Sequence, residues 1–410
     1  MRTLFLAIAV LLLSAAPSIP GLAEAEDGAP AQPPAAAADA APSEQPPPAE
    51  PTPEDKADAD IGKAAAEAVE KQYKIVSDSP AVPKLMAIID RIRPFTEKPY
   101  QEYQVKVINN DAINAFSLPG GYLYFNRGLL NAVESDDELA AVLGHEMAHV
   151  CLSHSRRLMS KSERYNKILG PIVLASILSQ SRSVDPGQIA VVGSLVVEDA
   201  INHYGREAEL EADHQSVVYL RKSKAYNPVA MLTVTEGLAH LEAGQVQVDP
   251  GVFQTHPLAK ERVERILVQL QDFGIPIYRR QVTKSLVASA ATATEGDREI
   301  GEIRLAAAGA RPWSEVVFRP AVDVDGLGPM ARAQQAADTM NSLLLQDLQA
   351  MEIATVKDGN GVAARARGQV LFTITPGDAE FHKTDVDALS QQAMQVLRAA
   401  FQQEKVTRAY

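Results

Sequence analysis

The chain has 410 residues, a net charge of −13 and one cysteine, which is enough for one large domain or two ordinary ones but for no intrachain disulfide. The negative charge is concentrated in residues 24–60, where ten acids face a single lysine, and the remainder is close to neutral. The sequence contains no arginine-rich tract, so composition argues against nucleic acid as a partner.

The first 23 residues have the pattern of a secretory signal peptide. Arg2 precedes an apolar run from Leu4 to Leu13, which is too short to span a bilayer, and small residues near Ala23 offer a cleavage site. An uncleaved anchor is the alternative. An exported chain without disulfides fits a bacterial periplasm, so we expect a periplasmic location, with membrane association left open.

Residues 24–60 are rich in Ala, Pro and acids, a composition that predicts a disordered linker, with order beginning near Ile61. Helical patterns follow at 64–76 and 82–95, and the run 103–108 predicts a strand. A Pro-Gly-Gly turn at 119–121 then separates two extended pieces.

A helix is predicted to start at Ser135, with Glu138 three residues on as the partner in a capping box, and to continue through "HEMAH" at 145–149. Two apolar stretches come later, at 168–178 and 189–197. Each is shorter than a membrane span, so we expect helices packed in the protein, with contact to a membrane surface as the alternative.

The "HEMAH" pattern is chemically suggestive because of its spacing. On a helix, His145 and His149 lie on one face and can bind the same metal ion, whereas Glu146 is rotated away and can act as the base for a metal-activated water. Such a pattern also arises by chance, so a coincidental or structural pair of histidines is the alternative.

A hydrolytic zinc site requires a third protein ligand. His154 falls out of register with the metzincin pattern, which favours a surface or supporting role. Three acids in "REAELEAD" are the other candidates, and spacing alone does not separate them because acidic runs often form solvated helix faces. These acids are Glu207, Glu209 and Glu211. Asp213, one turn after Glu209, could fix the tautomer of a ligand histidine.

Three motifs in the same order resemble the zinc metallopeptidase family that includes HtpX, the CaaX prenyl endopeptidase and BepA: "NAFSLPGGYLYFNRGLL", "HEMAH" and "EADHQ" preceded by Glu209. The resemblance covers roughly residues 61–281, and we expect a metallopeptidase domain over residues 61–285. It implies a gluzincin fold, mainly α with a small β-sheet (α+β). It implies one Zn²⁺ per chain, held by His145, His149 and Glu209, with Glu146 as the general base and Asp213 supporting a ligand histidine.

The resemblance implies further roles around this site. Asn114, Ala115 and Phe116 match an edge strand to which a peptide substrate could add. His256, in "THPLAKERVERI", matches a histidine that caps the zinc and keeps the enzyme latent, although a helix-capping His-Pro is an equal alternative. Three residues before or at the start of the ligand helix could donate to an oxyanion: His203, Tyr204 and Arg206. Of these, Arg206 matches the family's pattern best, with an ion pair to the nearby acids as the alternative.

The rest of the chain departs from this family. Residues 286–298 are small and polar and predict a linker. Residues 299–410 predict a small α+β domain of unknown role, with strands near 302–305, 316–318 and 368–375, helices near 330–345 and 385–403, and a hairpin turn at 359–361. We expect this domain to recruit substrates or to target the protein.

These observations favour a periplasmic zinc metalloendopeptidase (EC 3.4.24 type) that acts in protein quality control on unfolded or unassembled envelope or outer-membrane proteins. Its expected partners are such substrates, the outer-membrane assembly machinery or a membrane surface. Two alternatives stay open: a chaperone or assembly factor that uses the same groove with little proteolysis, and an interaction module whose metal is structural.

Overall fold

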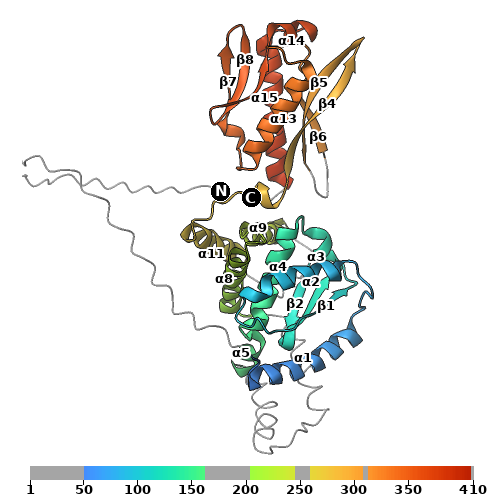
Figure 1. Cartoon of the computed structure of the whole chain (residues 1–410), viewed down its shortest axis with the longest axis vertical. Helices are drawn as coiled ribbons and strands as arrows, with labels where there is room; N and C mark the ends of the chain where they lie inside the picture. The colour runs from blue at the N-terminus through green and yellow to red at the C-terminus, as the bar shows by residue number, and fades with distance from the viewer. Residues whose placement is uncertain (1–49, 162–203, 245–258, 308–312, 408–410) are drawn as a thin grey trace, which may run out of the picture. The chain divides into compact units, whose positions relative to one another are not determined.

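The computed structural model describes residues 50–161, 204–244, 259–307 and 313–407. Helices and a small sheet make up the first part, to residue 282 (Figure 1). Its elements are α1 (Pro53–Gln72), α2 (Ala81–Ile92), η1 (Arg93–Phe95), β1 (Gln104–Ile108), β2 (Ala115–Leu118), η2 (Pro119–Gly121), β3 (Tyr122–Asn126), α3 (Arg127–Ala132), α4 (Asp136–Cys151), α5 (His154–Lys161), α8 (Arg206–Ser223), α9 (Val229–Gly244), α11 (Ala259–Asp272) and α12 (Arg279–Val282).

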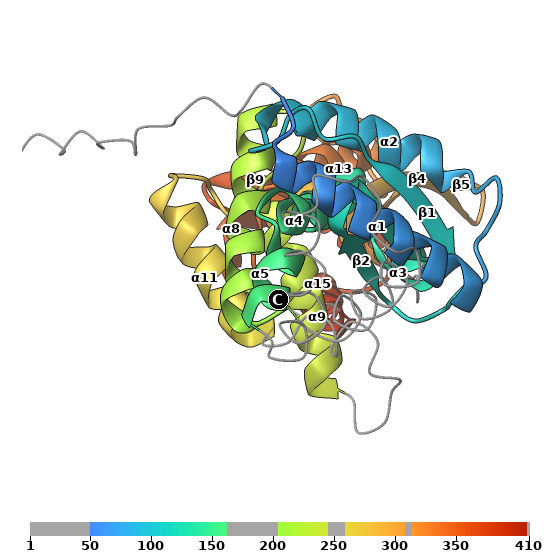
Figure 2. The same ribbon diagram turned by 90° about the horizontal axis from the view of Figure 1, so that it is seen from below.

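A three-stranded sheet and a set of packed helices form the core of this part. The strand order is β1-β3-β2, with β1 parallel and β2 antiparallel to β3. Helix α4 is central: it packs against α2, α8 and α9, and α8 packs in turn against α11 (Figure 2). Almost every residue of α4 from Glu138 to Cys151 is buried, because the helix is covered on all sides.

The predicted linker over 24–60 is wrong for its last residues, because α1 already begins at Pro53. Thr52 caps this helix in a capping box with Asp55. Asp55 also accepts a hydrogen bond from the Tyr100 hydroxyl (2.6 Å) and pairs with Lys98 (2.7 Å). Of the acids in this segment, Asp55 and Asp58 are therefore buried and paired, Asp58 with Arg156.

Glycines allow α1 to approach the Pro-Gly-Gly turn, which the structure has at η2 as predicted. A Cβ on Gly62 of α1 would lie 1.8 Å from the Pro119 carbonyl oxygen, and one on Gly120 would lie 2.7 Å from the Cα of Ala59. Gly120 also has a φ of 75°, which favours glycine. Side chains larger than hydrogen at these positions would push α1 away from β2 and β3.

The second part, from residue 286, contains two further three-stranded sheets, with strand orders β4-β5-β6 and β7-β8-β9. Its core is formed by α13, α15 and the inner faces of both sheets. Its elements are β4 (Leu286–Glu295), β5 (Arg298–Ala307), β6 (Trp313–Phe318), α13 (Pro329–Leu344), η3 (Ala350–Glu352), β7 (Ile353–Asp358), β8 (Gly361–Ala366), β9 (Gln369–Ile374), α14 (Pro376–Phe381) and α15 (Val386–Thr407).

The predicted linker at 286–298 is also wrong, because most of it forms β4, which pairs with β5 along its whole length. From Ala288 onward, β4 has no large apolar residue, and α13 packs closely over it. Asn341 of α13 donates to the backbone carbonyl of Ala288 and accepts from its N–H, both at 2.8 Å. Small side chains therefore mark a close helix-to-sheet contact here, and the α+β region begins at Leu286.

The mixed α+β class is confirmed, as are the helices predicted at 135–151, 330–345 and 385–403 and the hairpin turn at 359–361. Several predictions lie outside the described residues: the signal peptide, the apolar stretches 168–178 and 189–197, and the residues His203 and His256. Within the described part of the chain, no helix is long and apolar enough to cross a membrane.

Candidate metal centre

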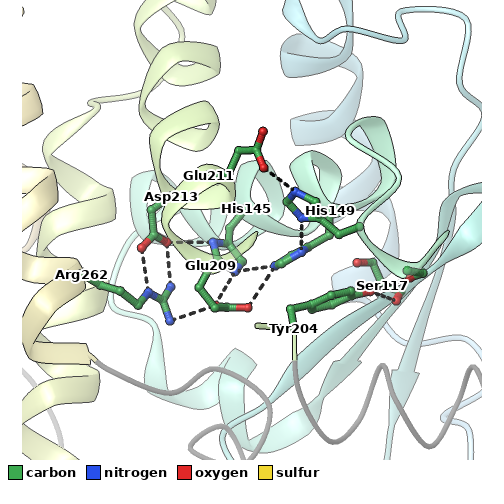
Figure 3. Close-up of polar contacts among 10 residues, drawn as sticks. Ser117, His145, His149, Tyr204, Glu209, Glu211, Asp213 and Arg262 are labelled. Carbon is green, nitrogen blue, oxygen red and sulfur yellow. Dashed lines mark hydrogen bonds and ion pairs between the residues drawn. The ribbon is translucent and has the colours of Figure 1, made fainter. Parts of the chain in front are cut away.

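Helix α4 presents the two histidines of "HEMAH" to a common point. Ser135 caps the helix by accepting from the Glu138 N–H, but the Glu138 carboxylate accepts from the Glu134 N–H, so only half of the predicted capping box forms. One turn apart, His145 and His149 bring their Nε2 atoms to 3.0 Å from each other (Figure 3). Both side chains are almost completely buried.

The third group comes from α8, where Glu209 is fully buried. Its Oε1 lies 3.4 Å from His149 Nε2 and its Oε2 lies 3.5 Å from His145 Nε2 (Figure 3). Ligand atoms at about 2.0–2.2 Å from a tetrahedral metal ion lie about 3.3–3.6 Å from each other, so the two His–Glu distances fit such an ion. Among the described residues, these three form the only cluster of metal-ligating groups that converges this closely.

Close packing of α4 on α8 makes this convergence feasible. Gly144 precedes His145, and a Cβ at this position would lie 2.8 Å from the Ser216 hydroxyl oxygen. That hydroxyl donates to the Ala141 carbonyl at 2.8 Å, so a hydrogen bond joins α4 and α8 at their point of closest contact. A larger residue at Gly144 would separate Glu209 from the histidines.

The other two acids considered as ligands lie elsewhere. Glu207 is exposed on the same helix. Glu211 is half-buried and lies between His154, at 3.3 Å, and Arg157, at 2.7 Å. Burial raises the pKa of Glu211, but its hydrogen bond and ion pair with Arg157 outweigh this effect and hold the pKa below 4.5. The geometry therefore selects Glu209 where spacing could not.

Asp213 lies behind His145, as the sequence suggested. Its Oδ1 lies 2.9 Å from His145 Nδ1, and Nε2 of the same ring faces Glu209. Burial lowers the pKa of His145, but hydrogen bonds to Asp213 and Glu209 outweigh burial and raise it to about 9. Conversely, burial raises the pKa of Asp213, but the charge of Arg262 and the hydrogen bond from His145 bring it below 3.8.

Arg262 of α11 is the main residue that sequence reasoning missed. It is buried and donates to both oxygens of Asp213 at 2.7 Å, and its Nη1 lies 3.2 Å from Glu209 (Figure 3). One guanidinium therefore contacts both Glu209, which is a candidate ligand, and Asp213, which supports the candidate ligand His145. The sequence carries no signal for this role, because the contact joins two residues that are 49 positions apart along the chain.

His154 is not a surface histidine, because only 2% of it is exposed. Its Nδ1 lies 2.7 Å from His149 Nδ1, so it contacts the side of His149 that faces away from Glu209. Burial, followed by the neighbouring His149, lowers the pKa of His154 well below 6.5, which keeps its ring neutral. The structure thus favours the supporting role over ligation.

The two described candidates for an oxyanion donor differ in place. Tyr204 is buried and its ring stacks on His149 with centroids 3.9 Å apart, and its hydroxyl donates to the Ser117 carbonyl of β2 at 3.1 Å (Figure 3). Arg206 is exposed and forms an ion pair with Glu261 instead. Only Tyr204 therefore lies beside the histidines.

Strand β2 is at the edge of its sheet, as expected for the stretch that contains Asn114, Ala115 and Phe116. All three residues are buried. Phe116 stacks on Tyr124 with ring centroids 5.1 Å apart, and both belong to a small apolar core beneath α1. Asn114 accepts from the Asn126 N–H at 2.9 Å and so extends the pairing of the strand.

The buried Glu146 follows His145 directly on α4. Its charge contributes to raising the pKa of the Tyr204 hydroxyl, an effect in which burial is the largest cause. It also contributes to raising the pKa of Arg262, for which burial acts in the opposite direction and Asp213 is the strongest partner. Glu146 therefore lies in the same electrostatic environment as the three converging groups.

Comparison with known proteins agrees with this arrangement. Residues 81–269, which include all the groups described above from α4, α8 and α11, match the model of peptidase family M48. Residues 314–404 match a separate model, a domain of unknown function (DUF8459). The second part of the chain thus has relatives but no assigned role.

Individual relatives are metalloproteases or proteases by name. The chain is 32% identical over 158 residues to the beta-barrel assembly-enhancing protease of Yersinia pestis, which covers 38% of this chain and 32% of that protein. It is 30% identical over 175 residues to metalloprotease LoiP of Escherichia coli (43% of this chain, 66% of LoiP) and 32% identical over 179 residues to mitochondrial metalloendopeptidase OMA1 of Arabidopsis thaliana (43% and 34%).

The chain spans about a third of the length of the beta-barrel assembly-enhancing proteases that it matches. Residues 81–269, which match the family model, contain the paired histidines of α4, the carboxylates of α8 and the arginine of α11. Through residues 81–269, this chain belongs to peptidase family M48.

Proposed function

We propose that the chain is a zinc-dependent endopeptidase with a gluzincin fold. The observation that carries the proposal is the convergence of His145, His149 and Glu209 at donor distances of 3.0–3.5 Å. Two imidazoles and one carboxylate are the ligand set of catalytic zinc sites that keep a position open for water or substrate. Glu146, next to a ligand on the same buried helix, supports a hydrolytic reading over a purely structural one.

In the proposed reaction, three residues bind the ion, one transfers a proton and one orients a ligand. His145, His149 and Glu209 hold the ion, and when bound it supplies a Lewis acid for water and for the peptide carbonyl. Glu146 accepts the proton of the attacking water at its carboxylate and delivers it to the leaving nitrogen. Asp213 holds the proton on Nδ1 of His145, so that Nε2 keeps its lone pair for the metal.

Substrate binding is proposed at the edge strand β2. A peptide that pairs with an edge strand is recognised through its main chain, which suits an enzyme with protein substrates of varied sequence. Tyr204, which stacks on His149, is the favoured donor to the oxyanion of the reaction. To act in this way, its hydroxyl must turn from the Ser117 carbonyl of this strand to the substrate. Arg206 is less suited, because it is exposed and paired with Glu261.

The cellular role proposed is quality control of unfolded or unassembled envelope proteins in the periplasm, either at the outer-membrane assembly machinery or at a membrane surface. The signal-like residues 1–23 support export. The name of the beta-barrel assembly-enhancing proteases supports this substrate class by analogy. His256 is proposed to keep the enzyme latent, and this hypothesis rests on its sequence context alone.

The test combines zinc content with cleavage of casein by the purified chain, comparing wild type with Glu146→Gln and His256→Ala. We expect one zinc per chain in all three, slow cleavage by wild type, faster cleavage by His256→Ala, and a loss on the order of 10²–10⁴-fold for Glu146→Gln. Glu207→Gln, an exposed change near the ligand of α8, is the matched control and should cleave like wild type.

Other outcomes point to other functions. Bound zinc without cleavage by any variant would favour a factor that holds unfolded clients in the same groove. Unfolding of the domain on chelation, again without cleavage, would favour a structural metal in an interaction module. A wild-type chain that binds no zinc would overturn the proposal.

A further inference from the structure

We propose that His154 and Glu211 form a positioning chain for the candidate ligand His149, and that zinc affinity depends on this chain. The proposal rests on the proposed zinc site and deepens it. His145 is held from behind by Asp213 and Arg262, and the structure places a different set of residues behind His149.

The position of His154 follows from a sharp reversal of the chain. Helix α4 ends at Cys151, and Ser153 adopts a φ of 52°, which turns the backbone before α5 begins. Lys98 and Arg156 both donate to the Ser153 hydroxyl, at 3.0 and 2.8 Å, and so hold the turn. As a result, the ring of His154 lies against the last turn of α4, beside His149.

The contacts form a continuous path to the surface. His154 Nδ1 lies 2.7 Å from His149 Nδ1, and His154 Nε2 lies 3.3 Å from a Glu211 carboxylate oxygen. That same oxygen accepts from Arg157 Nη1 at 2.7 Å. The path begins at a fully buried imidazole and ends at an ion pair whose side chains are 48% and 40% exposed.

Proton positions along this path are fixed by one requirement. If His149 binds the metal through Nε2, its Nδ1 must carry the proton and donate. His154 then accepts at Nδ1, carries its own proton on Nε2 and donates to the Glu211 carboxylate. Every donor meets an acceptor in this arrangement, so the path selects the tautomer of His149 that can bind the metal.

Two contacts restrain the ring of His149 in different directions. Tyr204 stacks on its face at an interplanar angle of 17°, which restrains the plane of the ring. His154 meets its edge at 72°, which restrains rotation within that plane. His154 contacts Nδ1 of His149 and is not one of the three converging groups, which are His145, His149 and Glu209. It is therefore a positioning residue that acts through His149.

The test measures zinc affinity by competition with a chelator for the full chain and its variants. His154→Leu keeps an apolar group in place but removes the acceptor, and we expect a loss of about 10–100-fold. His154→Asn should recover most of this loss, since its amide oxygen can accept near the Nδ1 position. Glu211→Ala, one bond further along the path, should give a smaller loss, and Glu207→Ala on the same helix is the matched control.

Circular dichroism of the metal-free proteins shows whether each variant is folded. A folded His154→Leu that binds zinc within about twofold of wild type would overturn the proposal, as would a His154→Asn as weak as His154→Leu. If His154→Leu does not fold, Glu211→Ala decides, because an affinity equal to that of Glu207→Ala would overturn the chain. A wild type without zinc would overturn the proposed function as well.

Discussion

In each part of the chain, an arginine pairs with a buried carboxylate, and the two clusters differ in what surrounds the charge. In the second part, Asp378 is fully buried and accepts from Arg332, from the Ala321 N–H and from Thr375, and Arg332 also donates to backbone carbonyls. In the first part, Arg262 faces Asp213 and Glu209, and Glu146 lies in the same environment.

The difference lies in charge balance and direction. In the second part, one arginine meets one carboxylate, and their remaining hydrogen bonds tie α13, α14 and the segment after β6 together. In the first part, three carboxylates share one arginine, and the lone pairs of three side chains converge on one point. Buried charge alone is therefore no sign of a site, whereas surplus negative charge with convergent donors fits a cation.

The largest expected effect is on stability, from Arg332→Met. Breaking a buried ion pair leaves Asp378 without its countercharge, so we expect a loss of about 3–5 kcal/mol in the free energy of unfolding, with or without zinc. Trp313, the single tryptophan, lies in β6 and reports unfolding of this part by fluorescence. Arg398→Met, exposed on α15, should change stability by less than about 0.5 kcal/mol. An equal loss in both variants would contradict the argument.

Arg262→Met should differ from Arg332→Met in its response to zinc. Without zinc, loss of the guanidinium leaves Asp213 and Glu209 buried together, and we again expect about 3–5 kcal/mol of destabilisation. Zinc should recover part of this loss, because its charge offsets the same carboxylates. The measurement is thermal unfolding by circular dichroism, with zinc and with chelator. If zinc shifts both arginine variants equally, the distinction between the clusters fails.

Local pattern was enough to predict much of the first part. The helix that contains "HEMAH" was predicted from its cap and its periodicity, and the candidate ligands on it follow from a spacing of four residues. The choice of Glu209 among three acids needed either family resemblance or the packing of α4 on α8. Arg262 could not be predicted, because its role depends on how α11 meets α8.

The wrong predictions have a common physical cause. Segments rich in small or acidic residues were interpreted as linkers, because such residues seldom build a core. In α1, Asp55 and Asp58 are paired with Lys98 and Arg156 across the fold. In β4, the small residues allow α13 to pack closely on the strand. Both compensations come from residues distant in sequence, so composition within the segment contained no sign of them.

Acid should remove the stability that the Arg332–Asp378 ion pair contributes, as the pH falls below about 3.8. Burial raises the pKa of Asp378, but hydrogen bonds from Arg332, Ala321 and Thr375 outweigh burial and hold it below 3.8. A carboxyl whose pKa is lowered by folding adds stability above its unfolded pKa, and this contribution is lost as the pH falls through the folded value. We expect Asp378→Asn to cost about 1.5–3 kcal/mol at pH 7 and less at pH 3, measured by Trp313 fluorescence. A cost that is the same at both values would contradict this assignment.

The smallest expected effect comes from a helix cap. Ser135 caps α4 and Thr375 caps α14, each by accepting from the N–H three residues on. Ser135→Ala should cost about 1 kcal/mol, measured by chemical denaturation, and Thr375→Ala should cost more, because the Thr375 hydroxyl also donates to the buried Asp378. Ser135→Ala should leave zinc affinity unchanged, since the cap lies more than two turns before His145 and packing holds the helix between them. A drop in zinc affinity would mean that the geometry of the ligands depends on the whole length of α4.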